Sequence, residues 1–297
     1  MRGLHIRKPF TRRSRNKNKW RAPLIVGTTS LLMAACVMPL PRTPVANALP
    51  GWQLTFDDEF EGSDHQPPDP ARWLPDTGGS GWGNHELQYY TSADNAYLDG
   101  DGHLTLEARR SDSGRNCWYG PCQYTSAKLT TLNSGRTTFA QRYGRFEARI
   151  KAPSGKGLWG AFWMLGDNLP TDGYPASGEI DVLETLGDRL ENVQQHAHAP
   201  RFDFGDEADI GSGGKIDDWH TYAIEWTPER IDWQIDGRTT QTLFKKDAGD
   251  GWIFDHPFYI VLNLAVGGDW PGSPDDETVF PAKMLVDYVR VYTPASP

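Results

Sequence analysis

The chain has 297 residues, with 30 Lys or Arg against 39 Asp or Glu and a formal net charge of -9 at pH 7. Its first 48 residues hold ten of the basic residues and no acid, so the rest of the chain carries 20 basic against 39 acidic residues, a net charge of -19. This acidic excess argues against nucleic acid and other polyanions as partners, because basic tracks bind them.

Residues 1–48 have the composition of an export signal. A basic run precedes an apolar stretch near residues 23–38, and Ala46-Asn47-Ala48 forms an A-x-A cleavage site. We therefore predict a secretory signal peptide over residues 1–48 and a mature chain that begins near Leu49, secreted to the extracellular space without a membrane anchor.

Other fates of this segment stay open. The apolar stretch is close to the length that spans a bilayer, although Pro39 and Pro41 cut it short. Cys36 in "LMAAC" approximates a bacterial lipoprotein site. Arg12-Arg13 resembles a twin-arginine export signal but lacks the hydrophobic residues that should follow it, so the export route is open.

From residue 50 onward the chain has the size of one large all-β domain and contains neither a low-complexity linker nor an internal repeat. Most of its strand-like segments alternate apolar and polar residues, and connectors rich in Gly, Pro and Asp separate them. The pattern predicts an all-β fold in which antiparallel sheets form a β-sandwich or a jelly roll. The predicted strands cover residues 103–110, 144–152, 221–227, 230–237, 258–266 and 284–292.

Two cysteines follow the signal segment, Cys117 and Cys122 in "CWYGPC". Gly120-Pro121 forms a natural turn between them, so an exported chain is expected to close a local disulfide here. A zinc site would need more ligands than the neighbouring sequence offers.

The segment "GEIDVLETLG" at residues 178–187 places Glu179, Asp181 and Glu184 among apolar residues. In a helix the three would point to about 0°, 200° and 140°, so no single face would hold them. In a strand Glu179 and Asp181 share a face, and a one-residue β-bulge near Val182-Leu183 returns Glu184 to the same side. We predict this bulged strand.

The predicted strand has a chemical consequence. About four strand steps of roughly 3.3 Å separate Glu179 from Glu184, and side chains reaching about 4 Å inward would bring their carboxyls roughly 5 Å apart, as in a retaining glycosidase. Carboxylates so close cannot all ionise, so at least one should have a raised pKa. A solvated acidic strand edge and a calcium site are the alternatives.

"GEIDVLE" resembles the E-x-D-x-x-E signature of glycoside hydrolase family 16, in the bulged form of its laminarinase-like β-1,3-glucanases. "WGNHELQYYT", "YGRFEARIKAP", "GLWGAFWMLG", "LNLAVGGDWPG" and "MLVDYVRVY" are similar to further family blocks, so the resemblance covers nearly all of residues 50–293. It implies a jelly-roll catalytic domain over residues 49–297 with an open substrate cleft. By position it implies that Glu179 is the nucleophile, Asp181 the residue that orients and tunes it, and Glu184 the general acid/base.

Aromatic residues are expected to floor the cleft, because sugar rings present apolar faces. Trp82, Asn84 and Tyr89 are the candidates for the non-reducing end of the substrate. Trp159 and Trp163 share one strand face, and the resemblance places them near the scissile sugar; core packing is the alternative for Trp163.

Two histidines in "QQHAHAP" share one strand face. Zinc binding by His196 and His198 is one alternative, but the resemblance matches His198 to a residue that binds substrate or tunes the carboxylates. The segment that follows, "APRFDFGDEAD", and Gly160 depart from the family pattern and leave the fine specificity open.

A structural calcium is a further expectation that rests on the resemblance. Glu59, the carbonyl of Gly100 and Asp287 match the positions that hold it in many family members. Surface salt bridges are the alternative for the two acids.

These features predict a secreted, retaining endo-β-1,3-glucanase that acts on β-glucan, works as a monomer and needs no cofactor for catalysis. The alternatives are a mixed-linkage β-1,3-1,4-glucan or β-galactan hydrolase, a transglycosylase, and a non-catalytic glycan-binding sandwich. Intact Glu179 and Glu184 argue against the last of these.

Overall fold

A computed structural model describes residues 49–111 and 114–295. The predicted signal peptide, the Cys36 lipid site and the Arg12-Arg13 pair lie outside the described residues. Among the described residues, no helix has the length and apolar character needed to cross a bilayer.

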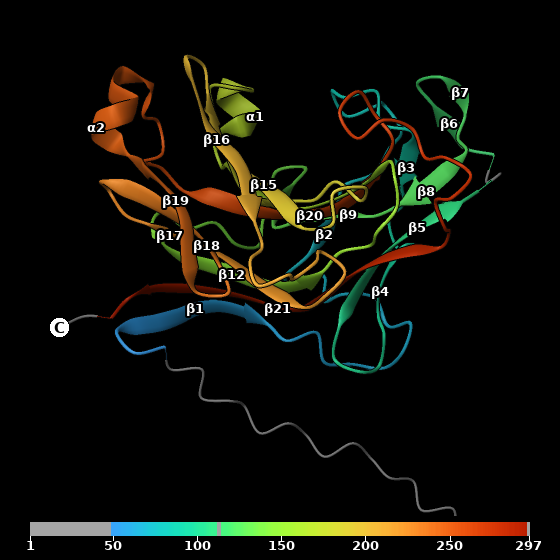
Figure 1. Cartoon of the computed structure of the whole chain (residues 1–297), viewed down its shortest axis with the longest axis horizontal. Helices are drawn as coiled ribbons and strands as arrows, with labels where there is room; N and C mark the ends of the chain where they lie inside the picture. The colour runs from blue at the N-terminus through green and yellow to red at the C-terminus, as the bar shows by residue number, and fades with distance from the viewer. Residues whose placement is uncertain (1–48, 112–113, 296–297) are drawn as a thin grey trace, which may run out of the picture. The chain divides into compact units, whose positions relative to one another are not determined.

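One layer of the fold is a seven-stranded antiparallel sheet, which carries the acidic strand at its third position (Figure 1). Each of its long strands pairs with a neighbour in antiparallel register over five to nine residues, apart from the break in the acidic strand described below. Its order is β16 (Phe202–Asp209), β15 (Asn192–Ala199), β14 (Glu179–Glu184), β13 (Leu158–Gly166), β20 (Phe258–Val266), β9 (Lys128–Thr130) and β2 (Leu74–Pro75).

The other layer is a ten-stranded sheet, antiparallel except where β3 runs parallel to β8. Its main order is β19 (Arg238–Phe244), β18 (Arg230–Ile235), β17 (His220–Trp226), β12 (Gly144–Lys151), β21 (Ala282–Pro294), β5 (Leu104–Arg110), β8 (Tyr124–Ser126) and β3 (Gln88–Tyr90). Two strands lie off this path, β1 (Trp52–Asp58) beside β21 and β4 (Ala96–Leu98) beside β5.

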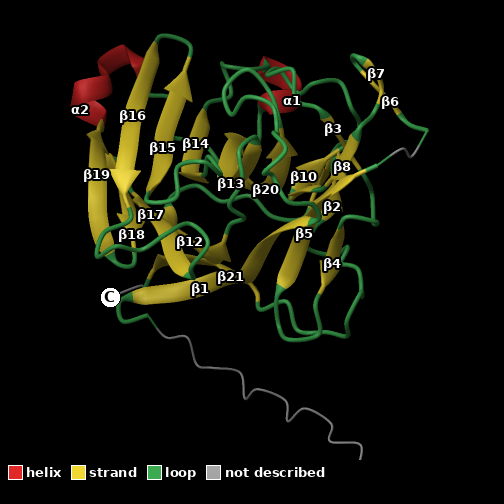
Figure 2. Cartoon of the chain, turned by 45° about the vertical axis from the view of Figure 1, so that its right-hand side comes forward, coloured by secondary structure: helices red, strands yellow, loops and turns green. Residues whose placement is uncertain are grey.

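The remaining elements are short (Figure 2). Two ribbons and three helical turns join the strands of the large sheets. They are β6 (Asn116–Cys117) with β7 (Gly120–Pro121), β10 (Leu132–Asn133) with β11 (Arg136–Thr137), and the helices α1 (Leu169–Asp172), α2 (Lys245–Ala248) and η1 (Gly249–Gly251).

The hydrophobic core lies between the two sheets, as expected for a sandwich. From β13 and β20 the residues at alternate positions, such as Phe162 and Leu262, are fully buried in it, and Phe146 and Ile224 enter from the ten-stranded sheet. The intervening residues of β13, including Trp163, line a pocket on the opposite face. The predicted two-sheet all-β architecture is therefore confirmed.

The six predicted strands match β5, β12, β17, β18, β20 and β21 to within about two residues at each end. In β17 the predicted alternation is also present, because Ile224 and Trp226 are buried while Glu225 forms an ion pair with Arg145. Periodicity thus identified six of the longer strands, five of which belong to the ten-stranded sheet.

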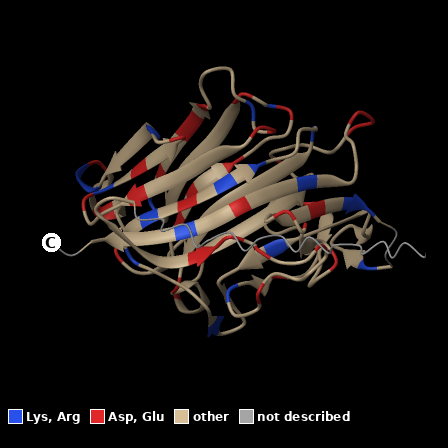
Figure 3. Ribbon diagram, turned by 90° about the horizontal axis from the view of Figure 1, so that it is seen from below, with Lys and Arg blue, Asp and Glu red and all other residues tan. Residues whose placement is uncertain are grey.

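The outer face of the ten-stranded sheet is charged rather than apolar. Figure 3 views the molecule from this side, with acidic and basic residues interspersed along the strands. Arg145, for example, is bonded to Glu147 at 2.8 Å and to Glu225 at 3.0 Å. The substrate cleft must therefore be sought on the other sheet.

Candidate active site

The acidic strand β14 contains the predicted bulge. Against β13, Asp181 pairs with Trp163 while Leu183 pairs with Phe162, so Val182 has no partner in the register. Against β15, the three-residue step from Asp181 to Glu184 spans only two residues of the neighbour. The extra residue turns Glu184 back to the face of Glu179 and Asp181.

The three carboxyl groups line one pocket of about 480 Å³ on the open face of the seven-stranded sheet. The apolar residues between them, Ile180, Val182 and Leu183, have no exposed surface. The bulged strand thus buries its apolar residues in the core on one face and presents its three acids to the pocket on the other, as predicted.

A second hollow of about 410 Å³ shares Glu179 and Glu184 with the first. It extends past β15 and is also lined by Gln194, His196 and Trp270. The acids therefore lie between two hollows and not at the end of one. This arrangement suits a polymer that binds across both hollows.

Burial dominates the electrostatics of the acidic pair. It raises the pKa of Glu179 well above the ordinary value of 4.5, and the neighbouring charge of Asp181 raises it further. It raises the pKa of Asp181 likewise, with Glu184 adding to the effect. The two side chains are hydrogen bonded to each other, so the pair retains one proton where separate carboxyls would have none.

Both histidines of β15 face this cluster. His198 places Nε2 3.3 Å from Asp181 Oδ2 and Nδ1 2.9 Å from Asp203 Oδ1. His196 places Nδ1 3.4 Å from Glu184 Oε2. The cationic form of His198 lowers the pKa of Glu179, which agrees with a role in tuning the carboxylates.

Asp181, His196 and His198 also form the only three-residue group of metal-type donors found among the described residues, with donor atoms within 4.8 Å of one another. Asp181 and His198 already contact each other, and the acids beside them are those of the bulged strand. The cluster is accounted for without an ion.

The first hollow has an aromatic wall. Trp82, Asn84 and Trp163 line it, and the indole of Trp163 donates from Nε1 to Asn263 Oδ1 at 2.7 Å. Trp163 is half-buried, which places its ring at the cleft instead of in the core. The structure therefore brings these three candidate residues together at one hollow.

Tyr89 is not part of this wall. Its ring packs against the Arg115 guanidinium at 5.3 Å, and the next residue, Tyr90, lines the hollow. The two tyrosines are adjacent in β3, so they point to opposite sides. The prediction for Tyr89 is thus wrong by one position.

Lys128 was not predicted to lie in the hollow. Its ammonium lies 4.4 Å from the centre of the Trp82 ring and 5.3 Å from that of Trp163, and it forms an ion pair with Asp76 at 3.3 Å. The sequence gives no signal for this position beyond a lysine in a short strand.

The second hollow contains further aromatic residues that the sequence did not single out. Trp159, which was predicted, donates from Nε1 to Glu184 Oε1 at 3.2 Å. Trp270 packs edge-on against Trp159 with ring centres 5.2 Å apart, and the exposed Tyr174 lines both hollows. Trp270 and Tyr174, which the sequence analysis did not single out, lie in connectors between strands. The signal that could have identified them is a large aromatic residue in a connector, where binding residues are often found.

Comparison with known proteins agrees with this geometry. The sequence model of the glycosyl hydrolases family 16 matches residues 84–290. The chain belongs to this family. A β-glucanase of Rhodothermus marinus is 40% identical over 258 residues, which cover 82% of this chain and 86% of the relative. A glucan endo-1,3-β-glucosidase of Cryptopygus antarcticus is 33% identical, covering 88% and 99%.

Solved structures of family 16 enzymes share the fold. The laminarinase catalytic domain of Thermotoga maritima superposes with a TM-score of 0.76 at 38% identity, covering 83% of this chain and all of that one. The endo-β-1,3-glucanase of Pyrococcus furiosus gives a TM-score of 0.75 at 40% identity, covering 83% and 96%. The resemblance drawn from the acidic strand is confirmed, and the protein is a glycoside hydrolase.

The predicted disulfide is present between Cys117 and Cys122, whose Cα atoms are 5.0 Å apart. It closes the β6–β7 ribbon, from which Trp118 Nε1 donates to the carbonyl of Glu86 at 2.9 Å. Tyr119 Oη donates to the carbonyl of Leu87 at 2.7 Å. The ribbon thus supports the family 16 loop that carries Trp82 and Asn84.

The residues predicted to hold calcium form ion pairs instead. Both carboxylate oxygens of Glu59 accept hydrogen bonds of 2.7 Å from Arg290, and Asp287 accepts one of 2.6 Å from Arg149. Gly100, with φ of +83°, lies in the turn after β4 beside Asp64. Two guanidinium groups balance the two acids, so this arrangement does not fit a calcium ion.

Proposed function

We propose that the protein is an endo-acting β-1,3-glucanase that cleaves with retention of configuration. The observation that supports it most is the bulge in β14, which sets Glu179 and Glu184 on one face between two aromatic hollows. The laminarinases and endo-1,3-β-glucanases among its relatives support the choice of linkage.

In the first step Glu184 donates its proton to the glycosidic oxygen while the Glu179 carboxylate attacks the anomeric carbon. The carbon–oxygen bond to the leaving sugar breaks, and a covalent glycosyl–enzyme ester forms. In the second step the Glu184 carboxylate removes a proton from water, the water oxygen bonds to the anomeric carbon, and Glu179 leaves as a carboxylate. Trp159 Nε1, 3.2 Å from Glu184 Oε1, holds the acid/base in place.

Asp181 keeps the proton that it shares with Glu179. Asp181 is the more deeply buried of the two, with 1% of its surface exposed, so it is the poorer place for a negative charge. Retaining the proton on Asp181 leaves Glu179 ionised for attack. A hydrogen bond from Asp181 then limits the basicity of the nucleophile and makes it a better leaving group.

Different parts of the substrate bind in the two hollows. The hollow lined by Trp82, Asn84 and Trp163 takes the glycone sugars, and the one lined by His196 and Trp270 takes the aglycone side. Because sugars bind on both sides of the acids, internal bonds of a polymer are cleaved.

The test is release of reducing sugar from laminarin by the wild type and by Glu179→Gln. We expect the variant to lose at least about a thousandfold in kcat, because no other group can form the ester. Exposed Glu191, in the turn before β15, supplies the matched control Glu191→Gln, which should retain wild-type activity. Equal activity of Glu179→Gln and wild type would exclude the mechanism.

The linkage is tested with a panel of laminarin, barley β-glucan, agarose and carrageenan. Preferred hydrolysis of laminarin supports the proposal. Preference for barley glucan would indicate mixed-linkage specificity, and a dominant yield of longer oligosaccharides would indicate transglycosylation. We also propose that the enzyme works outside the cell as a monomer, for which the mass of the protein in the culture medium is the measurement.

A further inference from the structure

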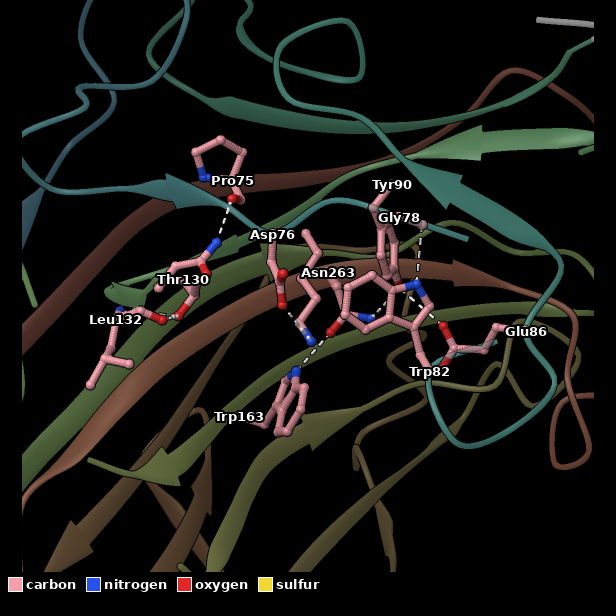
Figure 4. Close-up of polar contacts among 12 residues, drawn as sticks. Pro75, Asp76, Gly78, Trp82, Glu86, Tyr90, Thr130, Leu132, Trp163 and Asn263 are labelled. Carbon is pink, nitrogen blue, oxygen red and sulfur yellow. Dashed lines mark hydrogen bonds and ion pairs between the residues drawn. The ribbon is translucent and has the colours of Figure 1, made fainter. Parts of the chain in front are cut away.

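A row of four hydrogen-bonded side chains, three of them buried, runs along the wall of the first hollow (Figure 4). Trp163 Nε1 donates to Asn263 Oδ1 at 2.7 Å, and Asn263 Nδ2 donates to Tyr90 Oη at 3.1 Å. Tyr90 Oη in turn donates to Glu86 Oε2 at 3.3 Å. The row therefore joins β13, β20, β3 and the loop before β3.

Each hydrogen bond in the row has a fixed direction. An indole nitrogen only donates, so the amide of Asn263 must turn its oxygen to Trp163 and its nitrogen to Tyr90. The hydroxyl of Tyr90 accepts that bond and has its proton left for Glu86. Reversing any one bond would leave a buried donor without an acceptor.

The far end of the row is fixed in the same way. Gln88 Oε1 accepts from the backbone N–H of Val266 at 2.8 Å, so its Nε2 must donate to Glu86, at 2.6 Å. Tyr90 is 1% exposed, Gln88 is fully buried, and Glu86 and Asn263 are each 6% exposed. Water therefore cannot easily substitute for a lost partner.

We propose that Tyr90 is a positioning residue that acts through Asn263 to hold the indole plane of Trp163 for sugar stacking. This rests on the proposed function, because it takes the wall of the first hollow to be a glycone subsite. Trp163 is the one half-buried member of the row, and its ring faces the pocket. A ring fixed before the sugar arrives avoids the loss of rotamer freedom on binding.

Tyr90→Phe tests this because it removes the hydroxyl and keeps the ring, which packs 5.2 Å from Trp82. We expect kcat/KM for a long β-1,3-gluco-oligosaccharide to fall about fivefold, the factor expected from the loss of one hydrogen bond, with most of the change in KM. Trp163→Phe should reduce kcat/KM by at least as much.

The double variant decides between routes. If Tyr90 acts through Trp163, adding Tyr90→Phe to Trp163→Phe should reduce kcat/KM no further. Additive losses would overturn the proposal and indicate that Tyr90 acts through Glu86 or by touching the sugar itself. An unchanged KM in Tyr90→Phe would overturn it as well.

Tyr89→Phe is the matched control, since that ring lies against Arg115 outside the hollow and its kinetics should equal those of the wild type. The melting temperature of each variant distinguishes a loss of fold from a loss of positioning. A destabilised fold lowers the melting temperature, whereas a mispositioned Trp163 changes KM and leaves the melting temperature unchanged. If the wild type does not cleave β-1,3-glucan, the proposed function fails; if it does and the variants behave additively, only the role of Tyr90 fails.

Discussion

Glu179 and Asp181 lie two residues apart on β14, and their shared proton controls the response to pH. Both pKa values are raised by burial, so Glu179 loses its proton at a higher pH than an ordinary glutamate. Below that pH Glu179, the proposed nucleophile, is protonated and cannot attack. We expect the acid limb of kcat/KM on laminarin to lie clearly above pH 4.5, the ordinary value for a glutamate.

Asp181→Asn should move that limb to lower pH. The substitution removes the neighbouring carboxyl group, whose interaction with Glu179 raises the pKa of Glu179, while burial still acts on it. The variant will have a lower maximal rate, because the proton that Asp181 holds is lost. A limb that stays in place when Asp181 is changed would show that another group controls it.

Asp181→Asn also has a predicted effect on stability. In the folded state the pKa of Asp181 lies above its value in the unfolded chain, so stability is fully present below the unfolded pKa and is lost as pH rises through the folded one. Asparagine does not ionise. At pH 8 we expect a melting temperature a few degrees above that of the wild type, a change that about 1 kcal/mol produces in a domain of this size.

The control is to repeat the same comparison of melting temperatures at a lower pH. Near pH 3, below the ordinary value of 3.8 for an aspartate, Asp181 of the wild type is mostly protonated in both states, so the difference in melting temperature should shrink there. Thermal unfolding followed by circular dichroism at both pH values is sufficient. A variant less stable than the wild type at pH 8 would contradict the assigned direction of the pKa.

At the scale of single residues, the sequence identified the groups whose chemistry constrains their spacing. Glu179, Asp181 and Glu184 could be assigned to one face because the apolar residues between them had to be buried. Tyr89 was chosen over Tyr90 because nothing in the sequence marks the face of a three-residue strand. Lys128 and Trp270 reach the cleft only through tertiary pairing and loop folding, which no local pattern encodes.

At the scale of elements, the β6–β7 ribbon supports the loop that carries Trp82. Cys117→Ser with Cys122→Ser should destabilise the protein by about 2 kcal/mol, the entropic value for so short a loop. We expect KM for laminarin to rise about two- to fivefold through weakened contacts such as that of Trp118 with Glu86, with kcat little changed, because the acids lie on β14. Steady-state kinetics and thermal unfolding are the measurements.

Reductant provides the control for the ribbon. Dithiothreitol should produce the same rise of KM in the wild type and no change in the double variant. If the variant keeps wild-type KM, the hydrogen bonds of Trp118 and Tyr119 hold the loop without the disulfide.

Element prediction depended on length. Strands such as β12 and β20 cross a whole sheet, so their alternation repeats often enough to be recognised. Strands of two or three residues, such as β2 and β9, contain too few positions to show a period. These short strands form because their backbones pair with the free edges of neighbouring strands. That pairing depends on the assembled sheet and is not visible in the local sequence.

At the scale of the whole molecule, the two sheets have opposite tasks. The seven-stranded sheet leaves its outer face open for substrate, whereas the ten-stranded sheet covers its outer face with matched charges (Figure 3). Composition and periodicity predicted the two-sheet architecture, but they did not predict the order of the strands in either sheet. The charge pairs across strands could not be foreseen without that order.

This matching of charges leads to a prediction about calcium. Because Arg290 and Arg149 balance Glu59 and Asp287, we expect the melting temperature to be the same within about 1 °C in EGTA and in millimolar Ca²⁺, since a ligand stabilises only a fold that binds it. Arg149→Gln with Arg290→Gln frees both acids of their guanidinium partners. We expect Ca²⁺ to raise the melting temperature of that variant more than that of the wild type. Stabilisation of the wild type by Ca²⁺ would instead show that the ion displaces the arginines, and the calcium site inferred from the sequence would then be real.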